Sequence, residues 1–314
     1  MNAAARGLGV KFPIVQAPIG SATTPSLAAA VSNAGALGML AGTWRSPAAL
    51  GEMIRATQAL TPLPFGVNLV LEFDPAERLR ASLEAGVRII SLSWGDPAPW
   101  VPLVREAGGL VIFTAGSRDE AALGISAGVN FLVAQGVEAG GHVRGTTPLA
   151  RLVVEVKSVA EGIPVLAAGG IATAEDVRQA VANGADGVWV GTRFVASVES
   201  GAHADYKARL LAANGRDTVL GITFDIGWPA APHRALRNST IRAAEHGTRP
   251  GEGDIIARHA NGQPILRYED TVPLEGMTGD LEALALYAGT SVDGVDAVLP
   301  AAIIVEQLSK AFLR

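Results

Sequence analysis

One pattern of apolar and polar positions recurs along the chain: an alanine-rich stretch of helical periodicity, a glycine, and then a short apolar run. Two copies read "AAAVSNAGALGMLAG" and "RASLEAGVRIISLSWG". The apolar runs are rich in Val, Ile and Leu on both faces, which is typical of strands buried in a parallel sheet. The glycines stand where a helix ends in a left-handed residue, and we expect this at Gly35, Gly86, Gly108, Gly128 and Gly184.

Eight strand-like runs precede residue 192. Besides the repeated units, they include "FPIVQAP" near the start, "PFGVNLVL" and "IPVLAAGG". Eight alternating strands and helices predict an α/β fold, a (βα)8 TIM barrel over residues 1–215. A doubly wound open sheet is the alternative, but the first strand is not followed by the G-x-G-x-x-G turn of dinucleotide-binding sheets.

The pattern breaks after the eighth run. Residues 216–279 are rich in Gly, Pro and Arg and carry no long helix, and a stretch of this kind is usually functional. We interpret it as an irregular lid over the mouth of the barrel. Helical periodicity returns in "GDLEALALYAGTSV" and "PAAIIVEQLSKAFL", so residues 280–314 are expected to form C-terminal helices that pack on the barrel.

Composition excludes several classes of protein. Of the 314 residues, 49% are hydrophobic and 18% charged, which indicates a globular core. The net charge of −5, without a basic stripe, argues against a nucleic-acid partner. The chain has no cysteine, which excludes disulfides, thiolate metal sites and a cysteine nucleophile. It has neither a secretory apolar segment nor a run of about 18 apolar residues, so we expect a cytoplasmic protein without a membrane span.

The residues at the strand ends, where such barrels carry their chemistry, are small, polar and nearly uncharged. None of the four lysines lies there, which argues against a Schiff-base mechanism. No cluster of histidines and carboxylates predicts a metal site, and no pair of carboxylates suggests glycoside hydrolysis. A site with so few reactive groups usually delegates its chemistry to a bound cofactor.

Two adjacent strand ends are rich in glycine. Gly169 and Gly170 follow the seventh strand, and Gly191 and Thr192 follow the eighth. Barrels commonly bind phosphate here, because glycine lets backbone N–H groups approach the anion. The alternative is that both are only tight turns. Amide side chains at three other strand ends favour a flat, hydrogen-bonding ring system as the ligand: Gln16, Asn68 and Gln135.

The stretch "QGVEAGGHVRG" places His142 behind two glycines, directly after the sixth strand. An imidazole has an unperturbed pKa near 6.5, which suits a general base at neutral pH. The alternative is a histidine that stabilises the loop by donating to a carbonyl. In the expected lid, His233 is the one further histidine worth testing as a participant, and Trp228 is expected to pack within the lid.

Five motifs, in chain order, carry a resemblance to a known family: "QAPIG", "FGVNL", "AQGVEAGGH", "AAGGI" and "GTRF". Together with the closing segment they span nearly the whole chain, which resembles the nitronate monooxygenases, formerly called 2-nitropropane dioxygenases. Flavin-dependent enoyl-acyl-carrier-protein reductases and some NADH:quinone reductases are similar at the same motifs. The resemblance implies an FMN-dependent oxidoreductase with a barrel fold.

The resemblance also implies site residues. The backbone of Ala17, Pro18 and Ile19 is expected beside the isoalloxazine ring, and His142 matches the catalytic base of members that accept neutral nitroalkanes. No metal is implied. The resemblance implies further contacts with FMN at Asn68, Gln135 and Gly140. On the phosphate side of FMN it implies contacts at Gly170, Trp189, Val190, Gly191 and Thr192. The glycine pattern of the strand ends adds Gly169 to the phosphate side.

The chain departs from the family at three positions. Ile19 stands where the family often has Met beside the flavin, and Thr290 stands where a late motif often has Gln. Thr114 occupies the place of a lysine found on the fifth strand of some reductase relatives. The missing lysine argues mildly against the branch that uses pyridine nucleotides.

The expected reaction is oxidation of alkyl nitronates by O2, with a carbonyl compound and nitrite as products. From a neutral nitroalkane, His142 would remove the α-proton, whereas with a nitronate it would only position the anion. Expected partners are a small-molecule substrate and O2, with neither nucleic acid nor membrane. One alternative is an FMN enzyme that reduces a quinone or enoyl thioester with NAD(P)H, and another is a phosphate-binding barrel without flavin.

Overall fold

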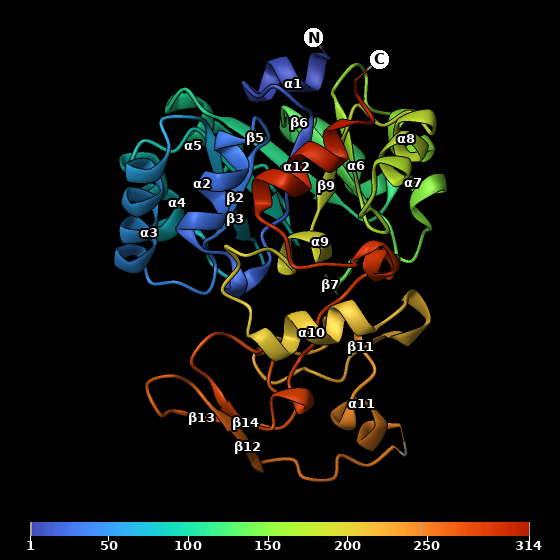
Figure 1. The fold of residues 1–314 in the computed structure, drawn as a ribbon. Coiled ribbons are helices and arrows are strands. Elements are labelled where there is room, and N and C mark those ends of the chain that lie inside the picture. Colours follow the sequence, from blue (N-terminus) through green and yellow to red (C-terminus); the bar gives the residue numbers. More distant parts are fainter. Residues whose placement is uncertain (1, 246, 314) are drawn as a thin grey trace.

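A barrel of eight parallel strands forms the centre of the computed structural model, which describes residues 2–245 and 247–313 (Figure 1). The strands follow one another around it in the order β1-β9-β8-β6-β5-β4-β3-β2. A bridge between Val15 and Leu37 joins the first to the last and closes the ring, which confirms the barrel and excludes the open sheet. Their bounds are β1 (Ile14–Gln16), β2 (Gly38–Ala41), β3 (Phe65–Val70), β4 (Ile89–Ser93), β5 (Leu110–Ala115), β6 (Phe131–Gln135), β8 (Val165–Ala168) and β9 (Gly187–Val190).

Both faces of these strands are apolar, because one lines the barrel interior and the other packs on helices. In β1, for example, Val15 belongs to the interior cluster and Ile14 to the outer one. Helix α1 (Ala3–Leu8) adds Leu8 to the interior cluster and closes the end of the barrel where the strands begin. The opposite end, where the strands finish, is the end that can bind a ligand.

Helices follow the first seven strands and cover the barrel. The predicted left-handed glycines are confirmed at the end of five helical segments, with φ between 73° at Gly108 and 105° at Gly184. After β9 only the short α9 (Thr192–Val195) forms, and α12 (Ala301–Ser309) packs against both α2 and α8 in its place. The covering helices are α2 (Pro25–Asn33), α3 (Pro47–Leu60), α4 (Ala76–Glu84), α5 (Val101–Glu106), α6 (Arg118–Ala127), α7 (Leu149–Lys157) and α8 (Ala174–Ala182). In the part of the chain that the structure describes, no helix combines the length and apolar character needed to cross a membrane.

The excursion after β9 forms a second lobe, here called the cap, at the carboxyl ends of the strands (Figure 1). It is less irregular than the sequence predicted, because it contains two small antiparallel sheets, β10-β11-β7 and β13-β12-β14. The two-residue strand β7 (Gly141–His142) comes from the barrel loop after β6, so the first sheet joins cap and barrel. The cap elements are α10 (Ala204–Ala212), β10 (Thr218–Gly221), β11 (His233–Leu236), α11 (Ser239–Ala244), β12 (Ile255–Arg258), β13 (Pro264–Leu266) and β14 (Thr278–Gly279).

The helix predicted at "GDLEALALYAGTSV" is wrong. Two 3-10 turns, η3 (Leu281–Ala283) and η4 (Thr290–Gly294), flank an extended stretch over 284–289. This stretch lies beside β11, where the N–H of Leu236 donates to the carbonyl of Leu286 at 2.8 Å. Leu286 and Ala285 belong to different hydrophobic clusters, so burial on opposite sides outweighs the helical periodicity. The helix predicted at "PAAIIVEQLSKAFL" is confirmed as α12.

Substitutions of two neighbouring isoleucines of α12 test whether this helix packs on the barrel. Ile304 is fully buried and Ile303 is 39% exposed. We expect Ile304→Ala to lower the free energy of unfolding by about 2–5 kcal/mol, because it leaves a cavity in the outer core. Ile303→Ala serves as the matched control and should change it by less than about 1 kcal/mol. Urea unfolding followed by circular dichroism measures both, and equal losses would mean that α12 does not pack as described.

Candidate active site

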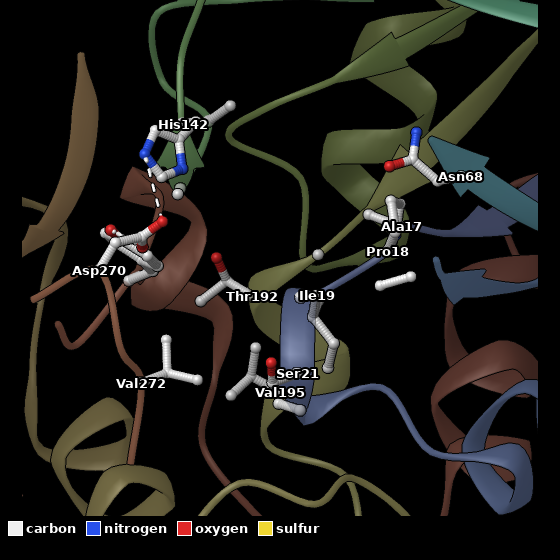
Figure 2. Close-up of a pocket in the computed structure, with 18 of the residues that line it drawn as sticks. Ala17, Pro18, Ile19, Ser21, Asn68, His142, Thr192, Val195, Asp270 and Val272 are labelled. Carbon is white, nitrogen blue, oxygen red and sulfur yellow. Dashed lines mark hydrogen bonds and ion pairs between the residues drawn. The ribbon is translucent and has the colours of Figure 1, made fainter. Parts of the chain in front are cut away.

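A cavity of about 570 Å³ opens at the carboxyl ends of the strands, between the barrel and the cap. In Figure 2, His142 and Asp270 lie on one side of it, and Ala17 and Asn68 lie on the other. The cavity collects nearly all of the predicted site residues: Ala17, Pro18, Ile19, Asn68, Gln135, Gly140, His142, Gly169, Gly170, Trp189, Gly191 and Thr192.

Two of the residues singled out from the sequence do not line the cavity, because successive residues of a strand face opposite ways. Val190 follows the inward-facing Trp189, so its side chain packs in the outer core, and only its carbonyl accepts a bond from Ala17 at 2.8 Å. Gln16 alternates with Val15 in the same manner. Its side chain is fully buried and bonds to the backbone of Met39 instead of facing the cavity.

The two remaining amides hold the cavity wall in place. The Asn68 amide donates to the Oγ of Ser91 at 3.1 Å, inside the barrel. The Gln135 amide donates to the carbonyl of His142 at 3.1 Å, and its oxygen accepts from the N–H of Arg144 at 3.2 Å. Gln135 therefore fixes the loop that carries the candidate base.

Glycine is required where the loops approach one another closely. A side-chain carbon at Gly140 would lie 2.3 Å from the backbone nitrogen of Gly289. Gly169 adopts a φ of 108°, and a side-chain carbon there would lie 2.8 Å from the nitrogen of Ala139. At Gly191, by contrast, the nearest atom would be 3.6 Å away, so this turn leaves room on the cavity side.

Helix α8 uses one of its own carboxylates at its N-terminus. Asp176 accepts from the N–H groups of Ala172 and Thr173 at 3.0 and 2.8 Å, completing a capping box. An anion near the seventh strand must therefore be bound by the glycine loops more than by this helix end. Arg193 also has a structural role, since its side chain is buried and donates to the carbonyl of Ala297 at 3.0 Å.

The His142 ring lies within aromatic side chains. It stacks on Trp228 with 4.0 Å between ring centroids and 27° between planes, and Trp94 meets it edge-on at 6.1 Å. Trp228, which the sequence predicted to pack within the lid, instead packs on the barrel loops, against Trp44, Phe73 and Trp94, and covers the candidate base. Its indole N–H donates to Glu72 at 2.8 Å, which fixes the covering ring. Burial lowers the pKa of His142 to about 3, and the neighbouring His233 makes a smaller contribution in the same direction.

His233 is a structural residue of the cap. Its Nε2 accepts from the N–H of Phe224 at 3.1 Å, and its Nδ1 therefore carries the proton and donates to the carbonyl of Ala231 at 3.0 Å. With both ring nitrogens in use and burial lowering its pKa, His233 stays neutral. These bonds hold His233 within the cap, on the strand that pairs with His142.

The sequence reasoning missed Asp270 and Tyr287, which both line the cavity. The hydroxyl of Tyr287 donates to Oδ1 of Asp270 at 2.5 Å, and Oδ2 lies 4.0 Å from Nε2 of His142. Burial raises the pKa of Asp270 to about 7, against the opposing effect of the Tyr287 bond. No local pattern marks either residue. Among the described residues, no group of three or more His, Asp or Glu side chains could hold a metal ion.

Comparison with known proteins agrees with this geometry. The family model for nitronate monooxygenase matches residues 3–79 and 72–311. The chain belongs to the nitronate monooxygenase family. It is therefore an oxidoreductase, and the family suggested by the sequence motifs is confirmed.

Individual matches within and around the family differ in their named activities. The nitronate monooxygenase of Pseudomonas aeruginosa is 32% identical, with 83% of this chain and 96% of the relative covered. A hydroxy-methyl-oxo-octahydroindene-carboxyl-CoA dehydrogenase of Mycobacterium tuberculosis is 32% identical over 77% of this chain and 68% of its own length.

Two solved structures cover 99% of the chain. FabK from Thermotoga maritima has a TM-score of 0.85, 31% identity and 96% of its own chain covered. The nitroalkane oxidase of Streptomyces ansochromogenes has a TM-score of 0.81, 30% identity and 99% of its own chain covered. The cap is thus part of a fold shared with both proteins.

The raised pKa of Asp270 predicts a pH-dependent cost to stability. Its pKa is about 7 when folded, against about 3.9 in an unfolded chain, so ionisation opposes folding as pH rises through this window. Asp270→Asn keeps an acceptor for Tyr287 but carries no charge. We expect the cofactor-free variant to exceed the wild type in unfolding free energy by about 1–3 kcal/mol at pH 8, and to match it near pH 4. Urea titrations at both pH values measure this, and a difference independent of pH would contradict it.

Proposed function

We propose that the protein is an FMN-dependent enzyme that oxidises alkyl nitronates with O2 to a carbonyl compound and nitrite. The observation that carries the proposal is His142, whose imidazole is only 12% exposed and lies on the wall of a cavity otherwise formed by glycine turns, amides and aromatic rings. Membership of the nitronate monooxygenase family and the overall likeness to a nitroalkane oxidase support it.

The cavity residues fit a flavin mononucleotide. We infer that the phosphate binds at Gly169, Gly170, Gly191 and Thr192, and that the ring lies against the backbone of 17–19, with Asn68, Gln135 and Gly140 around it. The room beside Gly191 supports this orientation. When bound, the flavin supplies the oxidising power and the reaction with O2.

The protein's own contribution is to orient the substrate and to take a proton from it. A neutral imidazole is needed for this, and the pKa of His142, lowered by burial, keeps the ring neutral across the physiological range. With a neutral nitroalkane, the ring accepts the α-proton. With a nitronate, the carbon is already deprotonated, and no proton has to pass to the ring. Trp228 and Trp94 cover the ring and limit the access of water.

A second candidate function is NAD(P)H-dependent reduction of a quinone or an enoyl thioester. It is favoured by the similarity to FabK and by the match to a dehydrogenase whose substrate is a carboxyl-CoA. Thr114, where some reductase relatives carry lysine, weighs against it. A barrel that binds phosphate without flavin is the third candidate, which a colourless preparation unable to take up FMN would support.

Anaerobic titration of the purified, FMN-loaded protein separates the first two functions. We expect propyl-1-nitronate to change the visible flavin spectrum within seconds, and NADH or NADPH to leave it unchanged. Admission of O2 should then restore the spectrum and release nitrite. Bleaching by a pyridine nucleotide but not by nitronate would instead assign the protein to the reductases.

A charge placed in the glycine turn tests the phosphate position. Gly170 has a φ of 69° and Gly108 a φ of 73°, and aspartate is among the residues that tolerate this conformation. We expect Gly170→Asp to weaken FMN binding by at least about tenfold, because the carboxylate repels the phosphate. Gly108→Asp, at a helix end outside the cavity, carries the same backbone strain and is the matched control. Fluorescence titration of the apoprotein with FMN measures both, and equal affinities would contradict the assignment.

A further inference from the structure

A buried ring nitrogen of His142 faces the carboxylate of Asp270, which has no role in the proposed reaction as described above. Nε2 is buried, and among the described residues it has no hydrogen-bond partner. The nearest acidic atom is Oδ2 of Asp270 at 4.0 Å, joined to it by the dashed line in Figure 2. Only one of the two ring nitrogens is joined to Asp270 by a dashed line (Figure 2). A buried polar atom without a partner costs free energy, so its position facing an acid needs a reason.

The imidazole cannot easily turn to find another partner. Trp228 covers one face of the ring, and three further rings meet it edge-on: Trp94, His233 and Tyr287 at 5.4–6.1 Å. His142 also lies opposite His233 in the pairing of β7 with β11, which fixes its backbone. The ring plane, and with it the direction of Nε2, is therefore set by the fold.

Hydrogen bonds also fix Asp270, and they engage its backbone and one of its two carboxylate oxygens. Its N–H donates to the carbonyl of Ile226 at 2.9 Å, which anchors the backbone. Its Oδ1 accepts from the Tyr287 hydroxyl at 2.5 Å, leaving Oδ2 directed at His142. The 4.0 Å between Oδ2 and Nε2 is longer than a hydrogen bond, but catalytic hydrogen bonds are often long before the substrate binds.

We propose that Asp270 is the positioning residue of His142: its carboxylate accepts a hydrogen bond from Nε2–H, which leaves the lone pair of Nδ1 free to take the substrate proton. The α-proton moves from carbon to Nδ1, and the carbon–hydrogen electron pair stays on the nitronate. The imidazolium that results is stabilised by the carboxylate, as in other acid–histidine pairs. This inference rests on the proposed function, because only a nitroalkane requires the proton transfer.

The charged and titratable groups around the pair leave Asp270 as the group that sets the pH dependence. His233 on β11 is neutral and uses both ring nitrogens, and the hydroxyl of Tyr287 donates to Asp270. Glu269 binds the N–H of Leu266, Glu72 binds Trp228, and Arg144 lies over the ring of Trp94. The working form needs Asp270 ionised, and its pKa is about 7. Turnover of neutral nitroalkane should therefore rise with pH through about 7 and be lost below it.

The first test compares two substrates in one variant. We expect Asp270→Asn to lower kcat/KM for freshly diluted, neutral nitroethane by on the order of 10²–10⁴-fold, and for propyl-1-nitronate by less than about threefold. The pH-dependent rise near 7 should disappear in the variant. Asp293→Asn, which removes a carboxylate that binds the N–H of Gly215 outside the cavity, is the isosteric control and should leave both values unchanged. Equal losses on both substrates, or an unchanged rise with pH, would overturn the proposal.

The second test asks whether Asp270 acts through His142. In a His142→Ala background, Asp270→Asn should cause no further loss on nitroethane, because residues that act as one unit are not additive. A full additional loss would mean that Asp270 contributes independently. Tyr287→Phe, which frees Oδ1, should lower kcat/KM for nitroethane by less than Asp270→Asn does.

The third test needs no turnover and separates this inference from the proposed reaction. In protein labelled with ¹⁵N-histidine, NMR identifies which ring nitrogen of His142 carries the proton, with His142→Ala providing the assignment. We expect the Nε2–H form at pH 8 in the wild type, and a change of tautomer in Asp270→Asn. A protein that turns over neither substrate but gives this result would refute the proposed function alone. The Nδ1–H form in the wild type would refute the pairing whatever the reaction is.

Discussion

The site depends on one short piece of antiparallel pairing, that of β7 with β11. Only two residue pairs are involved, Gly141 with Arg234 and His142 with His233, and they join the barrel loop to the cap. Such a short ladder is weak by itself. It is supported at both ends, because the N–H of Val143 donates to the carbonyl of Pro232 at 2.8 Å and the Arg234 guanidinium donates to the carbonyl of Val137. This pairing and the bonds from the Gln135 amide together fix the loop that carries the candidate base.

The barrel and the cap contribute different kinds of energy. The barrel interior and its helical cover bury large apolar clusters, from which the stability of the fold derives. Where the cap meets the barrel loop, the structure encloses groups whose burial is costly: the His142 ring, the Asp270 carboxyl and the Tyr287 hydroxyl, each with its pKa displaced by desolvation. Strained or desolvated groups of this kind persist only where the surrounding structure holds them. A stable barrel is the condition for a site of this kind.

Local sequence pattern was sufficient for the barrel and insufficient for the cap. Eight apolar runs and the glycines between them are short-range signals, and they also located the strand ends that line the cavity. Strand alternation predicts that Val190 faces the opposite way from Trp189, and Gln16 from Val15. The sequence does not say which of the two alternating sets of side chains faces the barrel interior. Asp270 and Tyr287 lie 128 and 145 residues after His142, in stretches without a motif, and meet it only because of how the cap folds. The extended stretch at 284–289 was mistaken for a helix for the same reason, since its partners on β11 are distant in sequence.

Under the proposed function, the direction of the reaction is decided at this pair of side chains. Barrels of very similar shape carry the names nitroalkane oxidase and FabK, so the fold does not select one reaction. Removal of an α-proton requires an acceptor at the cavity wall, whereas completing a reduction requires a proton donor there. A neutral His142 beside an ionised Asp270 is an acceptor, and the same pair becomes a donor once it has taken a proton. Burial raises the pKa of Asp270 to about 7, so the proposed acceptor form, with Asp270 ionised, becomes populated as the pH rises through this value.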